Sequence, residues 1–434
     1  MLSMAWYWQM RDLRTLARGW SREAQALGPN PFAGPARAAA PVWERCTATP
    51  PPWTGEVLDE ARRGVHLVHL ACMDTELEVW QTPEAQQKLR VIAQTYEPGL
   101  PQTCRSPGYL WFFAVLLTGD IERVRTIIDA AVDTCRNVPG YEWDLAANLH
   151  MRANMLANRT DWPGDATRDA DESLEILSLG RLGDLWGIAE GLAARAEAHE
   201  RRGRYRAAAA DYRAAIEHAE RLGARAQMGI LSARLGSTLI EAGEAEEGER
   251  LLREIIDQEG GSSDQAMPFA RLILAGWLGM TDRVPEAREQ LRLLREKFKI
   301  AYFVIFDAYI LGAEAWLEAV EGHHSLALDK IRRALERAED PLSDAIAPQM
   351  RSAYLTTAAY ALARVDGGGR ARDAARCLGA AAALLPPRHV ASGQEREVRR
   401  RAVERTRAVL GEAAYEAAYA EGGGLCAREA AALV

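Results

Sequence analysis

The chain has 434 residues, and its 61 acidic and 53 basic side chains leave a formal net charge of −8. Hydrophobic residues make up 48% of the sequence and charged residues 26%, a balance typical of proteins that fold around a core. Because proteins that bind DNA or RNA usually carry an excess of basic side chains, we expect no direct contact with nucleic acid.

The sequence opens with two expected helices, 1–10 and 13–27, which would form a first helical hairpin. Residues 28–55 follow with seven prolines and cannot continue a helix. This stretch is either a long surface loop between repeats or a boundary between the first hairpin and the rest of the chain. We favour the loop, since an isolated helical hairpin has too small a core to be stable.

Residues 109–117 form the longest apolar run, about half of what a membrane-spanning helix needs, so we expect a buried core helix there. The first residues lack the basic region and the cleavage site of a signal peptide. The six cysteines include no CxxC pair that would indicate a zinc site or a disulfide framework. These observations favour a cytoplasmic protein with reduced thiols and no membrane partner.

From residue 184 to residue 384 the sequence falls into pairs of amphipathic helices separated by short turns. The predicted pairs are 184–202 with 206–222, 225–242 with 245–258, 265–280 with 284–298, 301–321 with 325–339, and 346–364 with 370–384.

A small residue recurs early in the second helix of each pair, and a large residue follows four positions later. The small residues lie 40, 39 and 40 residues apart, and a small residue lets the two helices of a hairpin cross closely. The small positions are Ala208, Gly248, Ala287 and Ala327, and the large ones are Tyr212, Leu252, Leu291 and Ile331.

This pattern resembles tetratricopeptide repeats, although the period near 40 exceeds the more usual length of roughly 34 residues. We therefore predict an all-α fold, a right-handed superhelical solenoid of tetratricopeptide-like helical hairpins. The predicted organisation is a first hairpin with its proline-rich connection (1–54), a repeat array (55–384) and a C-terminal helical cap (385–434).

Motifs of catalysis and of cofactor binding are missing from the sequence. No GxxxxGK[ST] phosphate loop, GxSxG nucleophile elbow or HExxH zinc pair occurs. His66, His69 and Cys72 follow one another at three-residue steps, but the third has rotated off the face of the first, so a shared metal ion is hard to reach. His323 and His324 fall in an expected turn and would be solvated. We expect no enzyme, no cofactor and no metal site.

One apolar strip is a candidate binding site. In a tetratricopeptide superhelix the first helix of each pair lines the concave side, which would place five residues on that side. They are Phe269, Leu272, Met280, Tyr309 and Trp316. The strip is either a surface that receives a peptide or a small hydrophobic molecule, or simply the packing between neighbouring hairpins.

The final hundred residues carry a second resemblance. Residues 374–381 read AARCLGAA, a proline break follows at Pro386 and Pro387, and a basic helix spans 396–407. Beyond it come two tyrosines, a glycine triplet that would let the last helix fold back on the one before, and a short last helix. These features resemble the C-terminal tail of the large actinobacterial transcriptional activators, LuxR-type and AfsR-like (SARP) antibiotic regulators built on a STAND ATPase.

The first residues, 2–11, also resemble the first helical repeat of such regulators. The resemblance implies a sensor and scaffold domain that binds a peptide, protein or small-molecule effector and controls an upstream ATPase and DNA-binding module. The alternative is a free-standing tetratricopeptide-repeat scaffold that holds proteins together. Nothing in the sequence predicts the oligomeric state or the identity of the effector.

Overall fold

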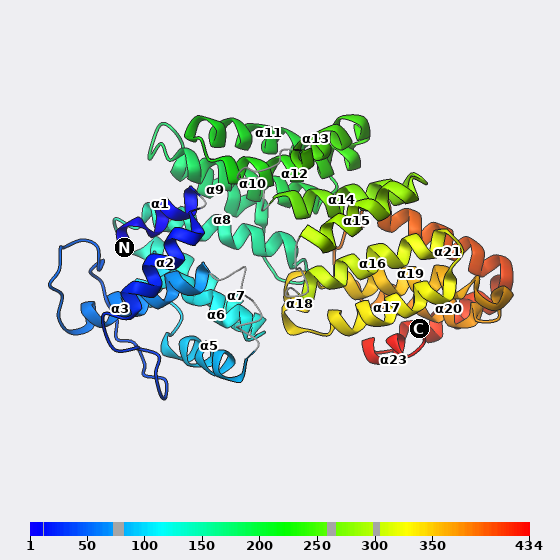
Figure 1. The fold of residues 1–434 in the computed structure, drawn as a ribbon, viewed down its shortest axis with the longest axis horizontal. Coiled ribbons are helices and arrows are strands. Elements are labelled where there is room, and N and C mark those ends of the chain that lie inside the picture. The colour runs from blue at the N-terminus through cyan, green and yellow to red at the C-terminus, as the bar shows by residue number, and fades with distance from the viewer. Residues whose placement is uncertain (12, 73–81, 258–265, 298–303) are drawn as a thin grey trace. The chain divides into compact units, whose positions relative to one another are not determined.

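The computed structural model describes the whole chain except residues 12, 73–81, 258–265 and 298–303 (Figure 1). Within the described residues every regular element is a helix and no strand occurs, so the predicted all-α class is confirmed. No helix in this part of the chain is long and apolar enough to cross a membrane. Contacts divide the chain into two compact units, 1–157 with 164–199 and 207–231, and 158–163 with 200–206 and 232–434.

The first unit contains the N-terminal helices, which pack on their neighbours in chain order (Figure 1). They are α1 (Ala5–Met10), α2 (Arg14–Gln25), α3 (Gly55–Ala71), α5 (Pro83–Thr95), α6 (Trp111–Leu117), α7 (Ile121–Asn137), α8 (Glu142–Asn158), α9 (Ala166–Leu177), α10 (Leu185–Glu200), α11 (Tyr205–Leu222) and the first part of α12 (Arg225–Ala242). The predicted buried helix is α6, in which Trp111 is fully buried.

The proline-rich stretch 28–55 is held against the helices of the first unit by hydrogen bonds. Gln102 accepts a bond from the Val42 amide at 3.0 Å and donates one to the Ala40 carbonyl at 2.8 Å. The Ala39 amide donates to the Thr95 carbonyl at 2.8 Å. Because proline lacks an N–H group, an irregular segment cannot pair its own backbone in full, and the neighbouring helices supply the missing partners.

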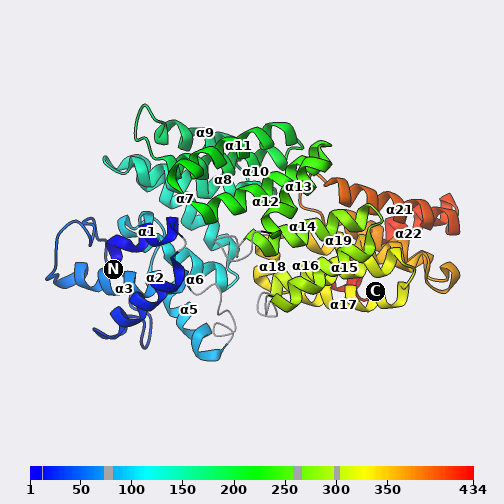
Figure 2. The same cartoon turned by 45° about the horizontal axis from the view of Figure 1, so that its top comes forward.

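The second unit continues with helices that again contact their neighbours along the chain (Figures 1 and 2). They are α13 (Ala245–Asp257), α14 (Ala266–Met280), α15 (Val284–Lys297), α16 (Val304–Val320), α17 (His324–Ala338), α18 (Pro341–Ile346), α19 (Met350–Leu362), α20 (Ala371–Ala383), α21 (Gly393–Leu410), α22 (Glu412–Gly423) and α23 (Ala427–Ala431).

The predicted helix pairs match α10 to α20 within a few residues at most ends, apart from 258, 265, 298 and 301–303, which lie outside the described residues. The helix predicted at 346–364 differs, because α18 ends at Ile346 and α19 begins only at Met350. Pro348 explains the break, since a proline disfavours helical backbone at the residue before it.

The small and the large residues of the repeating series are buried, as predicted. Ala208, Ala287 and Ala327 are fully buried, and so are the large residues Tyr212 and Leu252. At the glycine of the series, a Cβ atom on Gly248 would lie 2.5 Å from the Gly236 carbonyl oxygen of α12. The two helices therefore cross with their backbones in contact, which only a residue without a side chain permits.

The C-terminal glycines have the same role at a different crossing. A Cβ atom on Gly379 of α20 would lie 2.0 Å from the Tyr419 carbonyl oxygen of α22, and one on Gly422 would lie 2.0 Å from the Arg376 carbonyl oxygen. Helix α23 then packs on α19 and α20. The glycine triplet thus lets α22 lie directly on α20, in addition to ending α22.

Adding a methyl group at this crossing should destabilise the protein. We expect Gly379→Ala and Gly422→Ala each to lower the free energy of unfolding by about 1–3 kcal/mol, because α20 and α22 must move apart. Gly423→Ala is the matched control, since no atom lies within 4 Å of its Cβ position. It should be neutral or stabilising by up to ~1 kcal/mol. Urea unfolding followed by circular dichroism measures all three, and equal stability of the Gly422 and Gly423 variants would contradict the tight crossing.

A half-buried carboxylate, that of Glu249, ties α13 to the helix pair that follows it. Both oxygens of Glu249 accept from the Arg283 guanidinium, at 2.7 and 2.6 Å, and the Trp277 indole donates to the same carboxylate at 3.0 Å. Arg253 adds a further bond at 2.8 Å. The hydrogen bonds from Arg283, followed by those from Arg253 and Trp277, outweigh the effect of burial and lower the pKa of Glu249 to about 2.

This network predicts a pH dependence of stability. Because the folded pKa of Glu249 lies below its ordinary value of 4.5, its contribution is present above pH 4.5 and is lost as the pH falls towards about 2. Glu249→Gln should cost about 1–3 kcal/mol at pH 7, and the cost should shrink by pH 3. Glu254→Gln, which removes an exposed ion pair with Arg250 on the same helix, should change stability by less than ~0.5 kcal/mol at either pH. A cost for Glu249→Gln that does not vary between pH 7 and pH 3 would be inconsistent with this assignment.

Candidate functional site

A pocket of about 340 Å³ lies within the second unit, between α14, α16, α19 and α21. Three of the five residues of the predicted strip line it: Leu272 of α14, and Tyr309 and Trp316 of α16. Phe269 and Met280 do not line it, although both are half-buried on α14. The predicted strip is therefore only partly gathered around one cavity.

Most of the Trp316 side chain is buried in packing between helices. Its side chain is only 3% exposed, and its ring lies edge-on to Tyr360 with the ring centroids 5.1 Å apart. The Arg401 guanidinium of α21 lies 5.9 Å from the ring centroid. The ring thus fills the contact between α16, α19 and α21 and presents a small part of its surface to the pocket.

Tyr309 has the opposite character. Its side chain is 37% exposed, yet burial within the surrounding protein raises the pKa of its phenol. This combination is expected of a side chain that lines a cavity, because protein surrounds the group while part of its surface stays accessible. Tyr309 therefore offers the pocket an aromatic face and a neutral hydroxyl.

Tyr354 of α19 forms another wall of the pocket. Its ring lies against Gly312, where an added Cβ would be 2.3 Å from the Tyr354 Cε1 atom. Burial, followed by the nearby Tyr309 and Asp307, raises the pKa of Tyr354 well above its ordinary value. Among the described residues its buried hydroxyl has no hydrogen-bond partner, a state that costs about 1–3 kcal/mol.

The polar wall of the pocket comes from the start of α21. Ser392 Oγ accepts from the Glu395 amide at 3.2 Å, and Glu395 Oε2 accepts from the Ser392 amide at 2.7 Å, which forms a capping box. His389 Nε2 lies 3.3 Å from the same carboxylate. Burial works to raise the pKa of Glu395, but the bonds from His389 and Ser392 outweigh it and leave the pKa lowered.

Two arginines complete this wall. The Arg396 guanidinium donates to the Ala391 carbonyl at 2.5 Å, and Arg399 donates to the Tyr419 hydroxyl at 3.0 Å. Both partners are neutral, so the positive charges at the pocket are not cancelled by them.

No feature of the sequence indicates that α21 meets the predicted strip. The basic helix of the predicted C-terminal cap is α21, which lies along α19 and also touches α14 (Figures 1 and 2). Ser392 and Glu395, three residues apart, are a recognisable sign of a helix start at 393. That sign locates the helix in the chain but says nothing about the helices on which it packs.

His66 and His69 of α3 each contact a neighbouring segment of the first unit. His66 is buried against the ring of Phe32, and burial above all lowers its pKa to about 4, which keeps it neutral. His69 Nδ1 lies 3.0 Å from Ser21 Oγ. These contacts fit the interpretation of a packed helical face.

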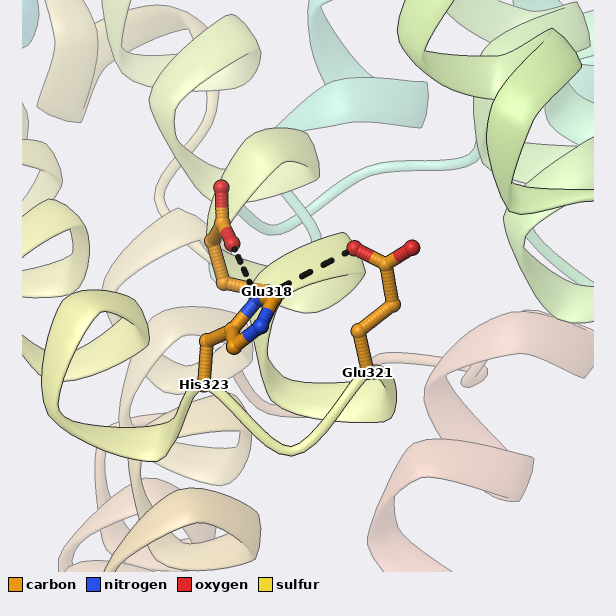
Figure 3. Close-up of side chains that lie close together, drawn as sticks. All are labelled: Glu318, Glu321 and His323. Atoms are coloured by element: carbon orange, nitrogen blue, oxygen red, sulfur yellow. Dashed lines mark hydrogen bonds and ion pairs between the residues drawn. The ribbon is translucent and has the colours of Figure 1, made fainter.

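Within the part of the chain that the structure describes, one group could place three ligand atoms around a metal ion: Glu318, Glu321 and His323 (Figure 3). His323 Nδ1 lies 3.1 Å from Glu318 and 4.0 Å from Glu321. Arg288 already donates to both carboxylates, at 2.9 and 3.1 Å, and these bonds above all lower the pKa of Glu318. The cluster is an ion-pair network in which a guanidinium occupies the carboxylates and opposes a cation.

Trp316 and Tyr309 should differ in their effect on stability. Trp316→Ala should lower the free energy of unfolding by about 3–5 kcal/mol, because it removes a buried ring and leaves a cavity. Tyr309→Ala should cost less than ~1 kcal/mol, since the phenol already faces the pocket. Urea unfolding of both variants measures the difference, and similar losses would mean that Tyr309 is packed as tightly as Trp316.

Comparison with known proteins adds no relative. No family model matches the chain, and neither does any curated protein or solved structure. Three observations therefore bear on the function: the pocket, the arrangement of the helices, and the resemblance at the two ends of the sequence.

Proposed function

We propose that the chain is the sensor and scaffold part of a transcriptional regulator, with a binding rather than a catalytic role. It would bind a peptide, protein or small-molecule effector and control an ATPase and a DNA-binding module attached upstream. We also propose that its helical pairs are tetratricopeptide-like repeats of about 40 residues in one right-handed superhelix. The spacing of the buried small residues Ala208, Gly248, Ala287 and Ala327 supports this repeat.

The observation that carries the proposal is the composition of the pocket wall. Helices α14, α16 and α19 come from the repeat-like pairs, whereas α21 belongs to the tail that resembles the regulators. A ligand in the pocket would touch both parts and favour the arrangement in which they enclose it. At a concentration of 100 times its Kd, such a ligand stabilises this arrangement by about 2.7 kcal/mol, enough to shift a two-state equilibrium.

One observation favours the alternative of a scaffold that only joins proteins. Helices α1 and α2 of the first unit expose large apolar side chains, among them Tyr7 at 43%, Leu16 at 47% and Trp20 at 51%. Exposed apolar surface of this kind is a common feature of protein-binding sites. A scaffold would use this surface and would not respond to a ligand in the pocket.

Filling the pocket separates the two functions. We expect native mass spectrometry of the purified chain to show a bound small molecule, and Ala353→Leu, which adds a side chain to the pocket wall, to abolish it. Ala417→Leu, an exposed position on α22, is the control and should retain the ligand. The scaffold hypothesis is correct if Ala353→Leu has no effect and only Leu16→Asp or Trp20→Asp causes the loss of a bound protein.

The regulatory part of the proposal has its own test. Gel-shift assays with the chain alone should show no sequence-specific binding of DNA, because its charge is acidic overall. The reading frame upstream should encode a phosphate loop in the same polypeptide. Tight sequence-specific binding of DNA by the chain alone would overturn the assignment.

A further inference from the structure

A segment of the chain itself, residues 388–394, lies across α12 and α14 and lines one side of the pocket. Arg388 donates to the carbonyls of Thr160 at 3.1 Å and of Trp162 at 2.8 Å, and the Gly393 amide donates to Glu241 of α12 at 2.7 Å. Farther along, Gln394 lies against Gly276 of α14, 3.2 Å from the Cβ position. Residues 388–394 thus run from the connection between α8 and α9 across α12 and α14, all within the second unit.

This covering limits what the pocket can accept. An extended peptide on the same helices would have to displace residues 388–394 together with their hydrogen bonds. The space that remains, about 340 Å³, lies near the lower end of the range for small-molecule sites. The pocket therefore suits a small molecule.

The lining supplies an apolar part and a charged part. Leu272, Met350 and the exposed edge of Trp316 form the apolar walls, together with the aromatic face of Tyr309. On the opposite side, Arg396 and Arg399 lie one helical turn apart on α21 and hydrogen-bond neutral groups.

Negative charge at the pocket is scarce by comparison. Glu395 is the one carboxylate among the described lining residues, and it is engaged by His389 and by the Ser392 amide. Two guanidinium groups against one carboxylate leave the pocket wall with a positive surplus. A guanidinium has five N–H donors, so each arginine retains donors for an anionic oxygen.

We propose that the pocket binds a small organic acid, whose single anionic group meets Arg396 and Arg399 and whose aromatic or aliphatic body lies between Leu272, Tyr309 and Trp316. This inference rests on the proposed function, since it takes the pocket as the effector site. It goes further by preferring a small molecule to a peptide and by naming the chemistry of that molecule.

Two dyes that share one aromatic framework and differ by a sulfonate group test the charge preference. 8-Anilinonaphthalene-1-sulfonate is an aromatic anion, and N-phenyl-1-naphthylamine is its uncharged counterpart. Fluorescence titration of the full chain should show that the anion binds about tenfold more tightly than the neutral dye. Arg396→Gln should remove most of that difference while leaving the affinity for the neutral dye unchanged.

Matched variants make the result decisive. Arg400→Gln is the control, because Arg400 lies on the same helix but pairs with Glu397 and Glu404. It should change neither affinity. Arg399→Gln should act like Arg396→Gln, and unfolding measurements on each variant show whether loss of the bond to Tyr419 has loosened α22.

The outcomes distinguish this inference from the proposed function. Ala353→Leu should abolish binding of both dyes in the pocket. The fluorescence that this variant loses relative to the unmodified chain is the signal assigned to dye in the pocket. If both dyes are lost but the arginine variants affect them equally, the preference for an acid is wrong and the pocket remains the effector site. If Ala353→Leu removes no signal from either dye, the pocket is not a ligand site, and both proposals are overturned.

Discussion

The close approach of helix backbones at small residues is the constraint on which the second unit depends. At Gly236 and Gly248, and again at Gly379 and Gly422, an added Cβ would fall within about 3 Å of a backbone atom of the opposite helix. Such crossings bring large neighbours into full burial, as at Leu252. Because each buried Å² of apolar surface contributes about 25 cal/mol, the gain from every large residue depends on the small one that lets the helices meet.

The pocket depends on the last of these crossings through α21. This helix begins at the capping box of Ser392 and Glu395 and ends at Leu410. Gly411 follows, and its φ of 76° allows the sharp turn into α22. Helix α22 is in turn fixed on α20 by Gly379 and Gly422. Helix α21 is therefore held at both ends, and the wall that it contributes to the pocket has a defined position.

The sequence predicted the local features well and the distant ones poorly. Helix periodicity and turn residues located most helices, and the alternation of small and large residues identified buried crossings, because both are encoded over a few residues. Only three residues of the predicted strip line the pocket, and Phe269 and Met280 lie outside it. Which residues of α14 face the pocket depends on the helices that pack against α14. The return of α21 to α14 joins residues more than a hundred positions apart, and no local pattern records such a contact.

The two polar clusters of the second unit differ in charge balance, and that difference separates a structural network from a binding surface. Around Glu318, the Arg288 guanidinium forms ion pairs with both Glu318 and Glu321, so its positive charge already has carboxylate partners. At the start of α21, Arg396 and Arg399 hydrogen-bond a carbonyl and phenol hydroxyl groups, which satisfy single donors without cancelling a charge. Arg396 is exposed and Arg399 is half-buried, and a guanidinium that bonds neutral groups keeps its charge and several N–H donors. An anion that enters the pocket can therefore accept hydrogen bonds from both guanidinium groups without breaking an ion pair of the kind that joins Arg288 to Glu318.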